Sequence, residues 1–379
     1  MHEPKGMLRV AVLVETSSAY GRGLIRGLSE YTRQNPELIL QLEETGPIKG
    51  VPGWLSQWTG HGLVARVETS EIAQELLGKN VPIVNVAGRR LSESIPHVDT
   101  DNRGIAELAV GYFVRRRFLN YAYLGSVGSD WAQWRRQAFE DVLRSHRKSL
   151  FYFEQDGAEP GKSALGEWLR SLPKPVALLA CNDRFARMVL DVCLEEALGV
   201  PDEVAVLGVD NDELLCTLSQ PQLSSIVPDA EAIGFHALAI LHRLMRGEAG
   251  GALRQWIAPL SIQARESTDT AATEDRVVRQ ALRYIHGNAL SEIGVGDVVG
   301  RIGVSRRLLE QRFRKVLGRA IHEEIFRVRL QEAQRLLRGT KLPLKDVALR
   351  SGFKRADYLS VVFRENLGMT PGEYRQKRS

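Results

Sequence analysis

The sequence contains few cysteines and none of the short motifs that mark common metal-binding and catalytic sites. Its 379 residues include three cysteines, Cys181, Cys193 and Cys216, and no two of them form a C-x-x-C pair. This usage predicts reduced, mostly buried thiols of a cytoplasmic protein. The motifs G-x-x-x-x-G-K-[ST], H-E-x-x-H and G-x-S-x-G are also absent, so nothing indicates a P-loop ATPase, a zinc protease or a serine hydrolase. We expect no metal site and no cofactor.

Long apolar runs are absent as well. No stretch approaches the roughly 18 consecutive apolar residues that a transmembrane helix needs, and the early run Val10–Val14 is too short for the core of a signal peptide. The composition, 44% hydrophobic and 26% charged residues, is ordinary for globular proteins. The chain is too long for one ordinary hydrophobic core. We therefore expect two or three globular domains that do not associate with a membrane.

The two ends of the chain differ in charge. Residues Glu274–Ser379 hold 23 Lys and Arg against 12 Asp and Glu, a balance of +11, whereas the remainder holds 28 against 34, a balance of −6. A basic C-terminal part beside a mildly acidic remainder predicts that only the former binds a polyanion. Charge alone is equally compatible with a solvated basic surface.

From residue 7 to about residue 265, short apolar runs alternate with helical patterns. Such alternation predicts parallel sheets with helices on both faces, and about ten strands over this length favour two lobes. The strand candidates are Leu8–Val14, Leu38–Leu42, Gly62–Arg66, Ile83–Val86, His97–Val98, Tyr121–Gly125, Ser149–Phe153, Val176–Ala180 and Val204–Val209. Residues 266–274 are small and polar and are predicted to form a linker. Residues 275–379 show only helical patterns, so we expect an all-α domain there.

The all-α domain contains two similar segments, residues 297–313 and 345–363. Each combines a short amphipathic helix, a break that contains glycine, and a second helix with Leu and Phe one turn apart. This is the pattern of a helix-turn-helix, whose second helix enters the major groove of double-stranded DNA. Leu309 and Leu359 are 50 residues apart, as are Phe313 and Phe363. The two reading helices could therefore occupy successive turns of one groove.

The exposed faces of the two reading helices supply the candidate DNA contacts. Arg pairs bidentately with guanine and Gln with adenine, so the first motif is predicted to be the stronger base reader, through Arg306, Arg307, Glu310, Gln311 and Arg314. The second motif is poorer in hydrogen-bonding groups and is expected to contribute more to shape and phosphate contacts, through Lys354, Arg355, Ala356, Asp357, Ser360 and Val361. The simpler alternative is a helical bundle with a solvated basic face.

Polar groups follow four predicted strands of the N-terminal domain. In open α/β sheets, ligands bind outside the carboxyl ends of the strands. Carboxylates, amides and guanidinium groups can form hydrogen bonds with adjacent hydroxyls of a sugar. An aromatic ring can cover the apolar face of a sugar. The candidate contacts to a small sugar are Asp101, Trp131, Arg135, Asp183, Asp210 and Asn211. For any single Asp or Asn, the alternative is a helix N-cap.

Two family resemblances cover nearly the whole chain. Residues 277–375 resemble the AraC-type transcription regulators, on the helix Arg329–Leu337 and on Ser351-Gly-Phe353, Tyr358-Leu, Phe363-Arg and Leu-Gly-Met-Thr-Pro371-Gly-Glu-Tyr374-Arg375. Residues 8–262 resemble the two-lobed, periplasmic-binding-protein-like core of LacI-type regulators, on Arg135–Phe139, Ala180–Asp183, Pro201–Asn211 and Pro221–Ile226.

Such a core in front of an AraC-type domain is similar to the xylose-responsive activators. The resemblance implies a homodimer that binds a DNA operator and a pentose such as xylose. If it activates transcription, it also contacts RNA polymerase. By the same resemblance Asp101, Arg135, Asp183 and Asp210 would be sugar contacts. Two places depart from these families: Arg312 stands where AraC-type domains usually have an apolar residue, and the segment Glu15–Arg22 differs in detail.

Two other functions fit parts of the sequence. Gly21, Gly23 and Gly27 loosely resemble a dinucleotide fingerprint, which would suit a Rossmann-like nicotinamide-dependent oxidoreductase with a helical appendage. Their spacing, G-x-G-x-x-x-G, is not that of the fingerprint, and the simpler explanation is close helix packing. A pure carbohydrate-binding module would leave the basic C-terminal domain unexplained. A DNA-binding transcription regulator accounts for both halves of the chain.

Overall fold

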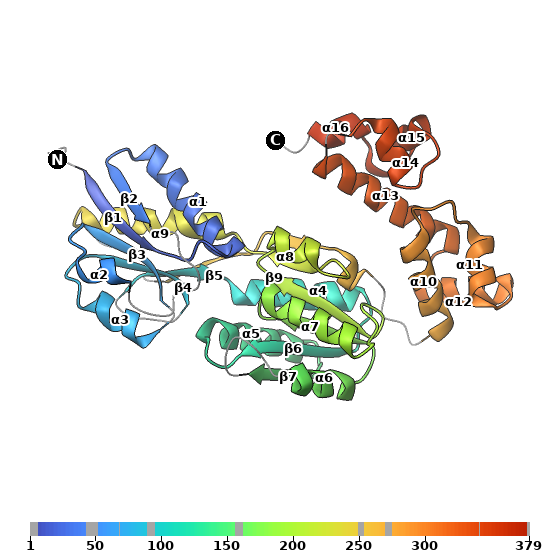
Figure 1. Ribbon diagram of the computed structural model, residues 1–379, viewed down its shortest axis with the longest axis horizontal. Coiled ribbons are helices and arrows are strands. Elements are labelled where there is room, and N and C mark those ends of the chain that lie inside the picture. Colours follow the sequence, from blue (N-terminus) through green and yellow to red (C-terminus); the bar gives the residue numbers. More distant parts are fainter. Residues whose placement is uncertain are drawn as a thin grey trace. The chain divides into compact units, whose positions relative to one another are not determined.

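The computed structural model describes residues 7–42, 52–67, 69–88, 95–155, 162–248, 254–269, 275–340 and 342–376. The chain forms two compact units, Met1–Asp269 and Thr270–Ser379 (Figure 1). Among the described residues, no helix is long and apolar enough to cross a membrane. The three cysteines are free and buried, as predicted.

The boundary between the units lies later than the sequence suggested. Glu266–Thr268 form a short 3-10 helix, η1, whose Ser267 and Thr268 are fully buried. The Ser267 hydroxyl donates a hydrogen bond to the carbonyl of Val206 (2.6 Å) and accepts one from the amide of Ser224 (2.8 Å). These contacts anchor η1 in the first unit, so the predicted linker began too early. Its residues 270–274 lie outside the described part of the chain.

The first lobe of the N-terminal unit is a parallel sheet with helices on both faces. In spatial order its strands are β11 (Arg254–Ile257), β5 (His97–Thr100), β4 (Ile83–Gly88), β3 (Gly62–Val67), β1 (Leu8–Leu13) and β2 (Leu38–Leu42). Side chains alternate along β1: Val10 and Val12 pack with α1 (Ala19–Gln34) and α9 (Ala230–Met245). Ala11 and Leu13 face α2 (Gly53–Ser56) and α3 (Ser70–Leu77). Both faces of the strand are therefore buried.

The glycines of α1 let it pack directly on α9. A Cβ atom at Gly27 would lie 1.9 Å from the carbonyl oxygen of Glu231, and one at Gly23 would lie 2.7 Å from the Cβ of Ala230. The partners are protein atoms of α9, so close helix packing accounts for these glycines. The loose dinucleotide fingerprint therefore has a structural explanation.

The second lobe repeats the architecture. Its strands, in spatial order, are β12 (Ser261–Gln263), β10 (Ser224–Val227), β9 (Val204–Val209), β8 (Val176–Ala180), β6 (Asn120–Ser126) and β7 (Leu150–Gln155), parallel except for the β10–β12 pair. Its helices are α4 (Asn102–Arg115), α5 (Asp130–Ser145), α6 (Lys162–Ser171), α7 (Asp183–Glu195) and α8 (Glu213–Leu218). The sequence pattern did not predict β10, β11 and β12, which are only three or four residues long.

The chain passes between the lobes three times within the described residues, after β5, after β10 and after β11. Hydrogen bonds tie these crossover segments together. The amide of Asp101 donates to the carbonyl of Ile257 (2.8 Å), and the amide of Leu260 donates to that of Val227 (2.8 Å). The two sheets are therefore joined at one set of strand ends, where the candidate ligand residues lie.

The C-terminal unit is all-α, as predicted. Its helices are α10 (Arg276–Asn288), α11 (Val295–Ile302), α12 (Arg306–Leu317), α13 (Ile321–Gly339), α14 (Leu344–Arg350), α15 (Ala356–Leu367) and α16 (Pro371–Gln376). Helices α11–α12 and α14–α15 form the two helix-turn-helix motifs. Ile321 and Ile325 at the start of α13 pack in the first core, and Ala333 and Leu337 further along it pack in the second. One helix therefore serves both motifs.

A buried carboxylate of α13 ties this helix to α10 and to the turn that precedes it. Glu324 is fully buried, yet Arg319 (2.6 Å), Arg327 (2.7 Å) and His286 of α10 (3.0 Å) all contact its oxygens. Burial alone would raise the pKa of this carboxyl, but the hydrogen bonds from His286 and Arg327 and the charges of both arginines hold it well below its usual range. The network therefore stabilises the unit when Glu324 is ionised.

Replacing Glu324 by Ala should lower the free energy of unfolding of the C-terminal unit by about 3 kcal/mol, because two arginines would lose a buried partner. The native contribution should be complete above the unfolded-state pKa of about 4.3 and disappear as the pH falls towards the depressed folded-state value. All six tryptophans lie before residue 257. A change in far-UV circular dichroism at constant tryptophan emission therefore reports the unfolding of this unit alone. Glu365→Ala, at an exposed position of α15, is the matched control, and equal unfolding of the two variants would refute the role of Glu324.

Candidate ligand site and DNA-binding surface

Arg135 of α5 contacts the start of α4 and the end of β8. Its Nε donates to the side-chain oxygen of Asn102 at the start of α4 (3.0 Å), and its Nη1 donates to the carbonyl of Cys181, just after β8. The guanidinium carbon lies 5.5 Å from the centre of the Trp131 ring, one turn earlier on α5. The structure thus brings together two predicted ligand residues, the cationic Arg135 and the aromatic Trp131.

Asp210 and Asn211 form a strained turn directly after β9. Their φ angles are 108° and 48°, in a region that residues other than glycine seldom adopt. The amide of Asp210 donates to the carbonyl of Ile226 (3.0 Å) and that of Asn211 to the hydroxyl of Ser225 (3.0 Å), so β10 holds the turn. The buried Oδ1 of Asn211 accepts no hydrogen bond from the described residues. Strain and an unused buried acceptor are typical of ligand sites.

Asp210 lies within electrostatic reach of both lobes. Burial raises the pKa of its carboxyl to about 6, against the opposing effect of Arg135 and Arg66, while Glu15 and Asp212 raise it further. Arg66 and Glu15 belong to the first lobe, and Arg135 and Asp212 to the second. This carboxylate therefore changes charge near neutral pH while facing charged groups of both sheets.

The first lobe contributes residues that the predicted site did not include. Arg66 in β3 donates from Nη1 to Glu15, just after β1 (2.9 Å), and its guanidinium carbon lies 5.4 Å from the Tyr20 ring. The Tyr20 hydroxyl donates to Asp99 (3.4 Å) and lies 3.3 Å from that of Thr100. Glu15 lies in the segment that departs from the family pattern, but Arg66 carried no signal beyond its place at the end of an apolar strand.

Asp183, a predicted ligand residue, is buried in the second lobe and bound by neighbouring groups. Its carboxylate is buried and accepts hydrogen bonds from the Ser225 hydroxyl (2.5 Å), the Asp212 amide (2.7 Å) and the Cys216 thiol (3.5 Å). A Cβ at Gly208 would lie 2.1 Å from its Oδ1, so only glycine leaves room for this carboxylate. Burial and the neighbouring Asp210 raise the pKa of Asp183 well above its usual value. Asp183 therefore positions the β9–α8 turn through the Asp212 amide and the Ser225 hydroxyl.

Asp101 lies in the crossover between β5 and α4. Its Oδ1 accepts a hydrogen bond from the amide of Arg103 (3.0 Å), so the side chain is the N-cap of α4. The alternative that the sequence left open for a lone Asp, a helix cap, therefore holds here. The residue is only half-buried.

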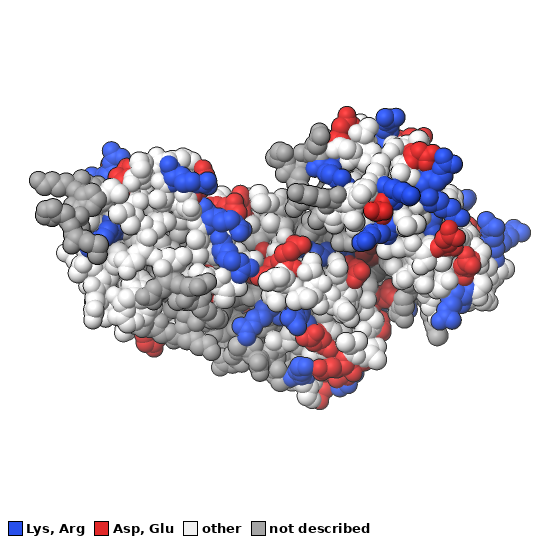
Figure 2. All heavy atoms as spheres, turned by 45° about the horizontal axis from the view of Figure 1, so that its top comes forward, with Lys and Arg blue, Asp and Glu red and all other residues white. Residues whose placement is uncertain are grey.

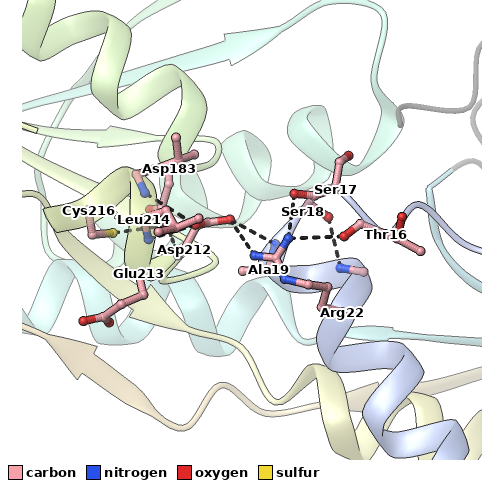
Figure 3. Close-up of polar contacts among 12 residues, drawn as sticks. Thr16, Ser17, Ser18, Ala19, Arg22, Asp183, Asp212, Glu213, Leu214 and Cys216 are labelled. Atoms are coloured by element: carbon pink, nitrogen blue, oxygen red, sulfur yellow. Dashed lines mark hydrogen bonds and ion pairs between the residues drawn. The ribbon is translucent and has the colours of Figure 1, made fainter. Parts of the chain in front are cut away.

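Asp212, which is not among the predicted ligand residues, connects the lobes (Figure 3). Its Oδ1 accepts hydrogen bonds from the amides of Leu214 (3.1 Å) and Leu215 (3.4 Å) and caps α8. Its Oδ2 accepts from the amide of Ala19 (3.1 Å) and from Nη2 of Arg22 (3.3 Å), both in α1 of the first lobe. One carboxylate thus caps a helix in each lobe, a role without a local sequence signature.

The first reading helix, α12, presents the predicted polar face. Leu309 and Phe313 are buried against the first core. The exposed residues of the opposite side are Arg306, Arg307, Gln311 and Arg314, and Glu310 is half-buried. The unexpected Arg312 donates from Nη1 to Asp275, the N-cap of α10 (3.3 Å). Arg312 therefore ties the reading helix to its neighbour and leaves α12 unbroken.

The second reading helix, α15, offers less free hydrogen-bonding capacity. Arg355 donates from Nε (3.0 Å) and Nη2 (2.6 Å) to the two carboxylate oxygens of Asp357. Lys354 lies 3.4 Å from Glu292. Ser360 donates to the carbonyl of Ala356 (3.0 Å), and Val361 is exposed. Arg355 and Lys354 are therefore already paired with carboxylates of the same unit.

The distribution of charge over the C-terminal unit suits a polyanion. Figure 2 shows Lys and Arg side chains gathered over this unit, with Asp and Glu between them. The basic face of α12 contributes three exposed arginines, Arg306, Arg307 and Arg314. Such a surface attracts the phosphate backbone of DNA.

Comparison with known proteins assigns both units. Residues 110–268 match the model of a periplasmic binding protein-like domain, and residues 298–377 match a helix-turn-helix domain. The xylose operon regulatory protein of Escherichia coli strain K12 is 31% identical over 98% of this chain and 97% of its own length. That of Haemophilus influenzae is 27% identical over 97% of this chain and 98% of its own.

A solved structure covers both units. The structure described as the xylose-binding transcription activator xylR matches 99% of each chain with a TM-score of 0.81 and 29% identity. These relatives are transcription regulators, and they give the nicotinamide-dependent oxidoreductase no support. The chain belongs to the family of the xylose operon regulatory proteins, and it is a DNA-binding transcription regulator rather than an enzyme.

Proposed function

We propose that this protein senses a pentose, with D-xylose the first candidate, and switches genes for carbohydrate use by binding their operator DNA. The observation that carries the proposal is the cluster of Asp210, Arg135, Arg66 and Glu15 at the strand ends of both lobes, in a chain similar over its whole length to a xylose-binding activator. Alternating carboxylates and guanidinium groups can accept from and donate to neighbouring hydroxyls of one sugar.

Within this site we assign the contacts by placement. Asp210, Asn211 and Arg135 would bind hydroxyls, Trp131 would cover an apolar sugar face, and Asp101 would contact the ligand at the crossover. Glu15 and Arg66 would bind from the first lobe, because their ion pair lies within reach of Asp210. Asp183 would act through the turn that it holds.

On DNA, we propose that α12 makes most base contacts and α15 chiefly positions the domain. The guanidinium of Arg355 is engaged by Asp357, whereas Arg306 and Arg307 are exposed at the start of α12, where recognition helices contact bases. We further propose that the protein works in the cytoplasm as a homodimer, and that as an activator it contacts RNA polymerase.

Replacing Arg306 and Arg307 together by Ala should lower the affinity for specific DNA at least about 30-fold, because each lost base contact costs ~1–3 kcal/mol. The measurement is a gel-shift titration of the full chain with a duplex that the wild type selects from a random pool. Arg184→Ala with Arg187→Ala removes two exposed charges from α7 of the first unit and should leave binding unchanged. Equal affinity of both double variants would refute the reader assignment.

Affinity for D-xylose should fall as the pH drops from 7.5 to 5, because the Asp210 carboxyl, with its pKa raised to about 6, gains a proton and loses acceptor capacity. Below the pKa the loss should approach about tenfold per pH unit if the carboxylate form alone binds. Calorimetry on the full chain with a panel of aldoses measures it.

Asp210→Asn should bind weakly at every pH and lose the pH dependence. Asp191→Asn, at an exposed position of α7, should behave as the wild type. A wild-type affinity that is constant between pH 5 and 8, or an unaltered Asp210→Asn variant, would contradict a contact through this carboxylate.

A further inference from the structure

We propose that the Asp212 carboxylate is a latch that holds the two lobes together and so sets the affinity of the sugar site. Figure 3 shows it between the turn before α8 in the second lobe and the start of α1 in the first. The proposal rests on the proposed sugar-sensing function for its effect on affinity. Asp212 itself lies outside the set of proposed sugar contacts.

The latch completes the N-terminus of α1. The first amides of a helix have no partner within it and carry partial positive charge. The Ser18 side chain satisfies the amide of Gly21 (3.0 Å), and the Asp212 carboxylate from the other lobe satisfies that of Ala19 (3.1 Å). Separation of the lobes would return this amide to water and leave the Asp212 Oδ2 without its two donors.

Arg22 strengthens the contact from the same helix. Its Nη2 donates to Asp212 Oδ2 (3.3 Å), and its Nη1 donates to the carbonyls of Thr16 (3.2 Å) and Ser17 (2.7 Å). The guanidinium therefore holds the loop before α1 and the carboxylate of the opposite lobe at once. Charge-assisted bonds of this kind are stronger than neutral ones, and the Asp212 side chain is only 10% exposed.

The latch is connected to the sugar site by the backbone. Asp210 and Asn211 precede Asp212 in the same strained turn. Asp183 fixes this turn through the Asp212 amide (2.7 Å) and through Ser225, which in turn accepts from the Asn211 amide (3.0 Å). A ligand that engages Asp210 therefore acts on the turn that carries the latch, and a closed latch presents Asp210 to the first lobe.

The lobes keep other connections when the latch is lost. Three chain crossovers join them, and the ring of His97 in β5 contacts that of Trp134 in α5, with centres 6.2 Å apart. Removing the Asp212 charge should thus shift an equilibrium between lobe arrangements without unfolding either lobe. Apparent affinity falls in proportion to the loss of the binding-competent arrangement.

The test uses the full chain with Asp212→Asn, whose amide oxygen can still cap α8 while its NH2 group faces the α1 donors. Glu213→Gln, one residue away, removes the same charge from an exposed side chain and serves as the matched control. Calorimetry with D-xylose should show about tenfold weaker binding for Asp212→Asn and wild-type binding for Glu213→Gln. Adding Arg22→Ala to Asp212→Asn should weaken binding little further, because both changes break one contact.

Lobe separation is measured independently, by electron–electron spin distances between labels on Arg33→Cys in α1 and Arg187→Cys in α7. Cys181, Cys193 and Cys216 are buried and should not take the label. Without sugar, Asp212→Asn should show longer and broader distances than the wild type, and saturating D-xylose should restore the short ones. Glu213→Gln should match the wild type throughout.

Two results separate the latch from the sugar site. If the wild type binds D-xylose and Asp212→Asn changes neither its affinity nor the distances, the latch is refuted. If no sugar binds the wild type but Asp212→Asn still lengthens the distances, the latch stands and the pentose proposal fails.

Discussion

The sensor unit depends on one buried carboxylate. Asp183 accepts hydrogen bonds from Ser225 and from the Asp212 amide, and so fixes a turn in which Asp210 and Asn211 adopt left-handed backbone angles. That turn carries the group that changes charge near neutral pH and the carboxylate that reaches the other lobe. In the proposed mechanism, sugar sensing and lobe position therefore share three consecutive residues. A ligand shifts such an equilibrium only by its different affinity for the two arrangements.

The DNA-binding unit also depends on a buried carboxylate, Glu324. Glu324 is buried among Arg319, Arg327 and His286, and the helix that carries it packs in both cores of the unit. Removing one partner of such a network lowers the free energy of unfolding strongly, because a buried charge is left unpaired. Replacing the whole network by apolar side chains of similar volume would change that free energy much less. The network fixes the position of α13, and this one helix positions both reading helices. The Arg312–Asp275 pair additionally holds the first reading helix to α10.

Local patterns predicted most of the fold, and tertiary contacts decided the rest. The C-terminal unit shows strong helical periodicity, which predicted an all-α domain with two helix-turn-helix motifs, whereas β10–β12 are too short to show a period. Arg135 and Asp210 were recognisable as polar groups after strands. The direction of Asp183 was not, because it depends on the space at Gly208 and on Ser225 from another strand. Asp212 and Arg66 act on the opposite lobe or strand, where no neighbour in sequence reveals the partner.

In the proposed mechanism, one chain couples a sugar site to a DNA-reading surface. The direct measurement is D-xylose affinity of the full chain, by calorimetry, with and without a saturating duplex that the protein has selected. Thermodynamic linkage requires that the duplex change sugar affinity by the factor by which sugar changes DNA affinity. We expect the two factors to be equal and well away from one, on the order of 5- to 150-fold. Sugar and DNA that bind without affecting each other would contradict it.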